Sequence, residues 1–557
     1  MANTESWDVV IVGAGAGGCV AAWTLAGLGV RTLVLDAGPQ FDRLRDYRVD
    51  QADWESSNFP DKPGSKGRYT SRLDQLEPRW RALRSWSLNY GPQAPGDRRR
   101  FGEYQHVRGV GGSTLHFSGE NHRLHPDALR LKSLFGVAAD WPFDYATLAP
   151  HYDAIERQLG TAGADEDRSR PRSGPFPLPA HAPSYASQKL MAATRALGVE
   201  WLANPVAIPS RPYKGRPSCV YCGQCNRGCM LGDKGTADLV FLAPALASGM
   251  CAVRPDTRAI RIEAESERVI RVVCRGADNQ DFALSPRAVV LACGALETPR
   301  LLLNSSASHS PQGLANESGL VGKNFMETVM AALAGLHPEP LGSMRGLPSD
   351  IVCWQHNAPD AIPGMVGGCR FVPMTASADL AGPINHARRM LSGWGSELKA
   401  AMRQTYGSAF ALGAFGESLP HAGAFIDLDP HERDGDGLPL ARINAGHEAS
   451  TPARLDFMRS RSLAILNAFG ISEIKEQITT YDLFSASHVF GTCRMGGEPS
   501  TSVVDAFGRS HRWGNLFVAD ASLFPTSGGG ESPSLTIGAL AHRMALHLAE
   551  LLAHRDF

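Results

Sequence analysis

Residues 8–36 read DVVIVGAGAGGCVAAWTLAGLGVRTLVLD, and this stretch decides the fold at the N-terminal end. The apolar run at 8–12 predicts a buried strand, the small residues at 15–28 predict a helix, and 32–35 predict a second strand. A strand, a helix and a strand in this order form a β-α-β unit, which implies a parallel sheet. The sequence therefore indicates an α/β fold.

The turn after the first strand carries Gly13, Gly15 and Gly18 in the spacing G-x-G-x-x-G. The first glycine makes a tight turn, the second lets the backbone approach a pyrophosphate, and the third lets the helix pack close to the strand. The helix N-terminus then offers free N–H groups to the phosphates. Asp36 ends the second strand, where a carboxylate can bind an adenosine ribose and disfavours the 2′-phosphate of NADP. We therefore predict a Rossmann-like site for FAD or NAD, the alternative being a tight turn without a ligand.

The chain has 557 residues, of which 43% are hydrophobic and 20% charged, with a formal net charge of −1. This length is sufficient for two domains. The near-zero charge argues against nucleic acid or an acidic membrane as a partner, and no apolar run is long enough to span a bilayer. Residues 1–7 are polar and lack the pattern of a signal peptide, so we expect a cytoplasmic protein.

Two further strand-turn-helix units follow far along the chain. One covers residues 286–303, and the other has a strand at 516–519 and a helix over 533–552. Residues 168–183 are rich in proline and predict a connector. The first unit and these two are widely separated, so we expect them to assemble one domain from distant segments.

Five such segments resemble the glucose-methanol-choline (GMC) oxidoreductases, in the order in which that family carries them. They are RGVGGST at 108–114, WP at 141–142 with HY at 151–152, VLACGA at 290–295, HVFGTCRMG at 488–496 and NLFVADAS at 515–522. The resemblance implies one FAD per chain, so it favours FAD over NAD. It also implies an α/β fold, α+β overall, in which a Rossmann-like FAD-binding domain is interleaved with a substrate-binding domain that contains a large mixed or antiparallel sheet.

The resemblance also predicts how the chain is divided. The FAD-binding domain is expected from residues 1–40, 105–140, 215–330 and 481–557, the substrate-binding domain from 141–214 and 331–480, and a lid from 41–104.

Alcohol oxidation needs a base within hydrogen-bond reach of the hydroxyl, and histidine suits that task. His488 stands where the GMC enzymes carry their active-site histidine, the alternative being a core histidine. Ser532 falls at the position of a second His or Asn in the family, with Glu531 beside it. Glu531 is expected to assist as a base, to bind an amine of the substrate, or only to offset the dipole of the following helix.

Other positions are expected to contact FAD by the same resemblance. His116 either carries a covalent link to the flavin, as in the related pyranose oxidases, or packs beside its ring. Asp520 is expected near the diphosphate or the ribityl chain, and Ala259 near the adenine. The remaining expected contacts are Gly111, Gly112, Ser113, Ala521, Pro533 and Leu535.

Four cysteines form the run C-x2-C-x2-C-x3-C at Cys219, Cys222, Cys225 and Cys229. Thiolates at this spacing can ligate an iron–sulfur cluster, and four thiolates also suit zinc. The third alternative is structural thiols or a disulfide. A cluster would favour a dehydrogenase that uses an external electron acceptor, whereas its absence would favour reoxidation by O2.

The expected reaction is oxidation of an alcohol to a carbonyl, on a sugar, an amino sugar such as an aminoglycoside, or a polyol. An oxidase of sterols or aliphatic alcohols and a non-redox flavin lyase on the same fold are the alternatives. A non-catalytic flavin subunit and an NAD-dependent dehydrogenase are further rivals. The sequence does not indicate an oligomeric state.

Overall fold

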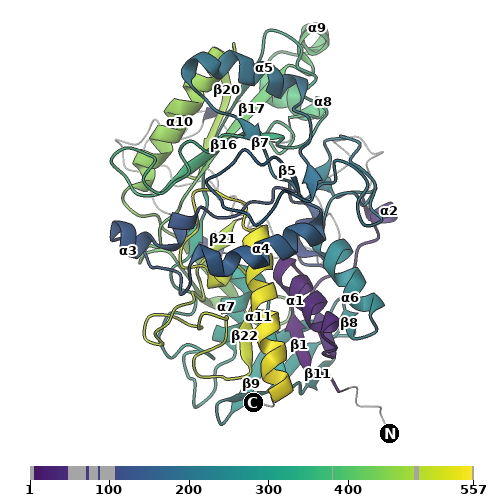
Figure 1. Cartoon of the computed structure of the whole chain (residues 1–557), viewed down its shortest axis with the longest axis vertical. Helices are drawn as coiled ribbons and strands as arrows, with labels where there is room; N and C mark the ends of the chain where they lie inside the picture. Colours follow the sequence, from purple (N-terminus) through teal and green to yellow (C-terminus); the bar gives the residue numbers. More distant parts are fainter. Residues whose placement is uncertain are drawn as a thin grey trace.

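The computed structural model describes residues 6–47, 107–378, 380–481 and 488–554, together with the backbone of two short strands at 70–73 and 86–87. Most of the lid expected at 41–104 lies outside these residues. Two large sheets organise the molecule, one in its lower half and one in its upper half as drawn in Figure 1.

The first sheet is parallel and has the strand order β22-β12-β1-β2-β8. Its strands are β1 (Val9–Val12), β2 (Thr32–Leu35), β8 (Cys251–Arg254), β12 (Ala288–Leu291) and β22 (Leu516–Val518). The central strands are buried on both faces, which explains their continuous apolar runs. The predicted β-α-β unit and both distant units therefore meet in one sheet, and the predicted fold class is confirmed.

Helices cover this sheet and carry the turns that build the site. α1 (Ala16–Gly27) packs beside the long C-terminal helix α11 (Ser534–His554), and α7 (Gly294–Asn304) follows β12. α4 (Tyr145–Leu159) packs across α11, where Tyr152 and Thr536 share a hydrogen bond of 2.9 Å between hydroxyls. Residues of α4 thus pack in the hydrophobic core of the parallel sheet. The expected domain boundaries, including the placement of 141–214 in the substrate-binding domain, stay a prediction.

The second sheet is antiparallel, with the order β16-β17-β14-β20-β4. Its strands are β4 (Trp86–Ser87), β14 (Val329–Leu336), β16 (Cys369–Pro373), β17 (Ala409–Gly416) and β20 (Ile474–Thr479). α10 (Thr451–Ala468) packs on one face of it, against Val329, Ala331 and Leu333. Side chains alternate along a strand, so Met330 and Ala332 face the other way and line a cavity.

Smaller elements complete the described part. One three-stranded sheet consists of β9 (Arg258–Glu265), β10 (Arg268–Arg275) and β11 (Asp281–Leu284), and another of β3 (Thr70–Leu73), β18 (Phe425–Arg433) and β19 (Pro439–Ala445). Three pairs of strands are separate from these sheets: β5 (Ala162–Gly163) with β6 (Leu178–Pro179), β7 (Leu202–Ala203) with β15 (Ile351–Val352), and β13 (Met326–Glu327) with β21 (Val489–Phe490). The other α-helices are α2 (Arg43–Asp46), α3 (Leu131–Phe135), α5 (Tyr185–Thr194), α6 (Ala243–Ala247), α8 (Pro383–Asn385) and α9 (Gly395–Thr405). Within the described ranges, no helix is both long and apolar enough to cross a membrane.

Candidate active site

One cavity of about 1340 Å³ runs from the glycine turn after β1 to the inner face of the antiparallel sheet. Many of the residues expected at the site line it together, although they come from all parts of the chain. They are Gly13, Gly15, Asp36, Gly112, Ser113, His116, Ala259, His488, Asp520, Ala521, Ser532 and Pro533. Gly18, Gly111, Glu531 and Leu535 do not line it.

The glycine turn has the geometry that its spacing predicts. Gly13 has a φ of +103°, and a Cβ there would lie 2.4 Å from the backbone oxygen of Ala292. A Cβ on Gly18 would lie 1.9 Å from the oxygen of Gly13, so this glycine allows helix α1 to approach the turn. A Cβ on Gly15 would meet no atom within 4 Å, so the backbone at Gly15 is open to the cavity. The turn therefore fits a pyrophosphate at the start of α1.

Asp36 lies where β2 ends and holds the turn in place. Its two carboxylate oxygens accept hydrogen bonds of 2.9 Å from the backbone N–H groups of Ala14 and Gly38. Burial raises the pKa of Asp36 to about 6, although these two bonds oppose the shift. The carboxyl group lines the cavity, which fits the predicted contact with a ribose.

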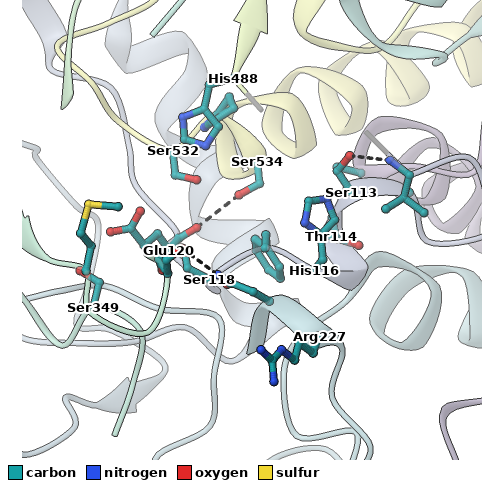
Figure 2. A pocket seen from close by; sticks show the side chains of 18 of the residues that line it. Ser113, Thr114, His116, Ser118, Glu120, Arg227, Ser349, His488, Ser532 and Ser534 are labelled. Atoms are coloured by element: carbon teal, nitrogen blue, oxygen red, sulfur yellow. Dashed lines mark hydrogen bonds between the residues drawn. The ribbon is translucent and has the colours of Figure 1, made fainter. Parts of the chain in front are cut away.

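A second wall of the nucleotide end comes from the short 3₁₀ turn η2 (Gly112–Leu115). A Cβ on Gly112 would lie 2.8 Å from the Cα of Gly15, so only a glycine lets the two turns meet. The Ser113 hydroxyl accepts a bond of 3.4 Å from the backbone of Val107, and His116 lies next to it on the cavity wall in Figure 2. These positions fit a flavin contact, and a covalent link at His116 stays a prediction.

Asp520, at the end of β22, connects its own segment to the start of α7. Its carboxylate accepts hydrogen bonds from the N–H of Gly294 at 2.9 Å, the hydroxyl of Thr298 at 2.6 Å and the N–H of Ser522 at 2.8 Å. Burial raises its pKa, and the three bonds oppose that shift. Asp520 thus fixes the turn before α7, which lies beside the glycine turn of α1.

The end of the cavity at which the catalytic base is expected carries His488 and Ser532, which lie close to each other in Figure 2. His488 immediately precedes the short strand β21. Its pKa is lowered to about 4, chiefly by burial and then by the positive charge of Arg370, while Glu120 opposes the shift. The imidazole is therefore neutral at neutral pH and able to accept a proton.

Ser532 belongs to a loop, residues 527–532, that is fixed by hydrogen bonds from three other segments. The Ser532 N–H donates to Nδ1 of His122 at 3.1 Å, and Nδ2 of Asn357 donates to the oxygen of Gly529 at 2.9 Å. Nε of Arg370 donates to the oxygen of Gly530 at 2.6 Å. These hydrogen bonds fix the position of the loop and, with it, of the Ser532 side chain.

Glu531 points away from the cavity, so the structure does not bring it to His488 as a base or as a ligand for an amine. It is fully buried, and its Oε1 accepts bonds from Nη2 of Arg170 at 3.0 Å and from the N–H of His125 at 3.2 Å. Ser532 lines the cavity, whereas the bonds of Glu531 to Arg170 and His125 hold its carboxylate outside it. Glu417 is buried close to it, and burial raises the pKa of Glu417 to about 8.

Glu120 and Arg370 form an ion pair on the cavity wall that was not predicted from the sequence. Nη1 and Nη2 of Arg370 donate to Oε1 and Oε2 of Glu120, both at 2.8 Å, and both residues line the cavity. The pair joins positions 250 residues apart, so no local pattern identifies it. One signal was present: Arg370 interrupts the apolar run of β16, and a buried arginine requires a partner.

The cysteine run does not form a ligand cluster. Cys222 is exposed and lines the cavity, the thiol of Cys229 donates to Asp233 at 2.6 Å, and Cys219 and Cys225 pack against a small apolar cluster. Burial raises the pKa of the Cys225 thiol to about 12. In the part of the chain that the structure covers, no three His, Cys, Asp or Glu side chains lie together as metal ligands, and every cysteine is a free thiol. The arrangement fits neither the cluster, the zinc site nor the disulfide.

Comparison with known families and proteins gives consistent matches. Models of the GMC oxidoreductase family match residues 137–330 and 424–541, and a model of an NAD(P)-binding Rossmann-like domain matches 11–61. The chain is 30% identical to a 6'''-hydroxyparomomycin C oxidase of Streptomyces lividus, over 98% of this chain and 92% of that one. It is 28% identical to a paromamine 6'-oxidase of Streptomyces fradiae (99% and 92% covered) and 28% identical to a fructose dehydrogenase large subunit of Gluconobacter japonicus (98% of each).

Solved structures with the same fold share little sequence. A pyridoxine 4-oxidase from Mesorbium loti superposes with a TM-score of 0.65 at 18% identity, over 97% of this chain and 99% of that one. A formate oxidase variant from Aspergillus oryzae superposes with a TM-score of 0.67 at 14% identity, over 100% of both chains. These likenesses show the fold.

Proposed function

The chain belongs to the GMC oxidoreductase family, and on that premise we propose that it oxidises a hydroxyl group of a sugar, an amino sugar or a polyol to a carbonyl, with His488 as the base. The chain is an FAD-dependent alcohol oxidoreductase. The observation that supports the finer proposal is that a dinucleotide turn and a neutral, partly exposed histidine line one cavity.

The residues of the nucleotide end fit FAD. Gly13 and Gly15 leave room for the pyrophosphate, Asp36 suits the ribose, and Gly112 and Asp520 line the path towards His488. When bound, FAD accepts the hydride that leaves the alcohol carbon. The protein has to position the hydroxyl, exclude water and accept the proton.

His488 is suited to accept that proton. With a pKa of about 4 the imidazole is almost entirely neutral at pH 7, so its unprotonated ring nitrogen is a hydrogen-bond acceptor. The neutral imidazole can accept the hydroxyl proton as the hydride leaves the alcohol carbon. We propose that Ser532 orients the substrate hydroxyl towards His488, because its loop is fixed and its side chain lies next to the imidazole in Figure 2.

The lining of the catalytic end supports a polar substrate. Besides His488, it carries Glu120, Arg370, Ser349, Ser532 and Ser534. A sterol or an aliphatic alcohol would cover these polar groups with apolar surface and offer them no hydrogen bond of its own, which is unfavourable in a buried site. The relatives named for paromamine, hydroxyparomomycin and fructose act on polyhydroxylated compounds of this kind.

The test is an anaerobic incubation of the FAD-loaded protein with paromamine, D-fructose and 2-methyl-1,2-propanediol. We expect one of them to bleach the flavin with one equivalent of carbonyl product per flavin reduced. A product formed without flavin reduction would indicate the lyase instead, and no reaction with any sugar, amino sugar or polyol would refute the proposal. Oxygen consumption during turnover then separates an oxidase from a dehydrogenase.

A further inference from the structure

We infer that the Glu120–Arg370 pair binds a second hydroxyl group of the substrate, next to the one that is oxidised, and so selects vicinal diols over monohydric alcohols. The inference rests on the proposed function and names the part of the site that recognises the substrate. Glu120 lines the cavity, whereas Glu531, the carboxylate expected from the sequence to assist as a base or to bind an amine of the substrate, does not.

The pair lies beside the reacting groups. Figure 2 shows Ser532 between His488 and Glu120, on one side of the cavity. The hydroxyl of Ser534 donates to the backbone oxygen of Glu120 at 3.3 Å, which connects Glu120 to the segment that carries Ser532. A substrate whose hydroxyl contacts His488 and Ser532 therefore has its neighbouring carbons near Glu120.

A closed ring of hydrogen bonds fixes the distance between the pair and Ser532. The N–H of Ser532 donates to Nδ1 of His122, and Nε2 of His122 bonds Oδ1 of Asn204 at 2.7 Å. Nδ2 of Asn204 donates to Oε1 of Glu120 at 2.9 Å. Arg370, the partner of Glu120, closes the ring because its Nε donates to the backbone oxygen of Gly530, in the same loop as Ser532. All members of the ring are buried, so the carboxylate is positioned before any substrate binds.

Glu120 retains an unused acceptor. Burial alone would raise its pKa, but the guanidinium of Arg370 lowers it to about 2, so the group is an ionised carboxylate. Such a group has about four lone-pair sites. Oε1 accepts from Arg370 and Asn204, whereas Oε2 accepts from Arg370 alone among the described residues. Oε2 can therefore accept one more donor from the cavity.

The charge of the pair favours a hydroxyl over an ammonium as that donor. The carboxylate and the guanidinium cancel, and a cation placed at Glu120 would also lie close to Arg370. A hydroxyl donates to the carboxylate and can accept from the guanidinium, so it is complementary to both members. The pair consequently recognises the hydroxyl-bearing carbon beside the reacting one, whether or not the sugar carries amines elsewhere.

Two matched alcohols test this inference. 2-Methyl-1,2-propanediol and 2-methyl-1-propanol differ only by the hydroxyl on the neighbouring carbon, and each is used to reduce the flavin of the FAD-loaded enzyme without oxygen. We expect the wild-type enzyme to prefer the diol by about 10- to 100-fold in kcat/KM, the range for a hydrogen bond to a charged group. Glu120→Gln should reduce that preference to a few-fold, mainly through the diol.

Two controls keep the result interpretable. Glu476→Gln removes another cavity carboxylate that is paired with an arginine, Arg389, and should leave the ratio of the two alcohols unchanged. Glu120→Gln leaves the charge of Arg370 buried without its partner. A double variant, Glu120→Gln combined with Arg370→Gln, restores the charge balance and is measured beside the single variant. The single and the double variant should show the same loss of preference for the diol.

A second readout is the Kd of each alcohol for FAD-loaded proteins that also carry His488→Ala, taken from the change in flavin absorbance on binding, because this substitution removes the proposed base and slows reduction. Equal constants for diol and alcohol with Glu120 present, no binding of either, or an unchanged ratio in both Glu120 variants would overturn the inference. The proposed function would still stand if any sugar, amino sugar or polyol reduced the flavin, so the two failures are distinguishable.

Discussion

Replacing Arg170 by methionine tests whether the buried ion pair between Arg170 and Glu531 fixes the loop that carries Ser532. Arg170 is 5% exposed and Glu531 0% exposed, and their ion pair has an N–O distance of 3.0 Å. Arg170 also donates to Asn357, which binds the oxygen of Gly529, and its guanidinium stacks on Trp354 at 3.9 Å. Arg170→Met leaves a buried carboxylate without its cation, a change that costs about 3–5 kcal/mol. We expect the free energy of unfolding to fall by that amount.

The assay is urea unfolding of the FAD-loaded protein, with flavin reduction measured in parallel. Removing the charge of Glu531 as well, in Arg170→Met with Glu531→Gln, should recover much of the stability, because no unpaired carboxylate remains. Both variants should reduce the flavin more slowly, because Ser532 loses its support. A loss below about 1 kcal/mol for Arg170→Met, or a double variant less stable than the single one, would refute the reasoning.

Two further predictions follow from the geometry of the cavity. Gly18→Ala places a Cβ 1.9 Å from the oxygen of Gly13, so the purified variant should retain little or no FAD. The FAD content is measured as flavin absorbance per chain, and a full FAD content would contradict the close packing of α1. The rate of flavin reduction should fall as the pH drops through about 4, because His488 becomes protonated below its pKa and can no longer accept a proton. A rate independent of pH from about 3.5 to about 6, with FAD retained, would exclude His488 as the base.

The nucleotide end of the cavity was predictable because its determinants are local. Gly13, Gly15, Gly18 and Asp36 lie within one β-α-β unit, and their spacing within it predicts the turn without any distant contact. His488 and the other distant segments were predicted by resemblance rather than from local chemistry. They line the same cavity because the parallel sheet brings the ends of β1, β12 and β22 together.

The parts that sequence reasoning missed depend on contacts between distant residues. Glu531 and Ser532 are adjacent, and the order of residues does not reveal which of them enters the cavity. The direction is set by Arg170 and His125, more than 350 residues away along the chain. The cysteine spacing is likewise compatible with a ligand set, but the thiol of Cys229 bonds Asp233 and those of Cys219 and Cys225 pack with apolar side chains.

The most direct test compares anaerobic flavin reduction in the wild-type enzyme and in His488→Ala, with the alcohol that reduces the wild type fastest. The account predicts equal FAD content in the two proteins and a rate of reduction about 10²- to 10⁴-fold lower in the variant, the usual contribution of a general base. A variant that binds FAD and reduces it at the wild-type rate would contradict the assignment of His488 and, with it, the proposed mechanism.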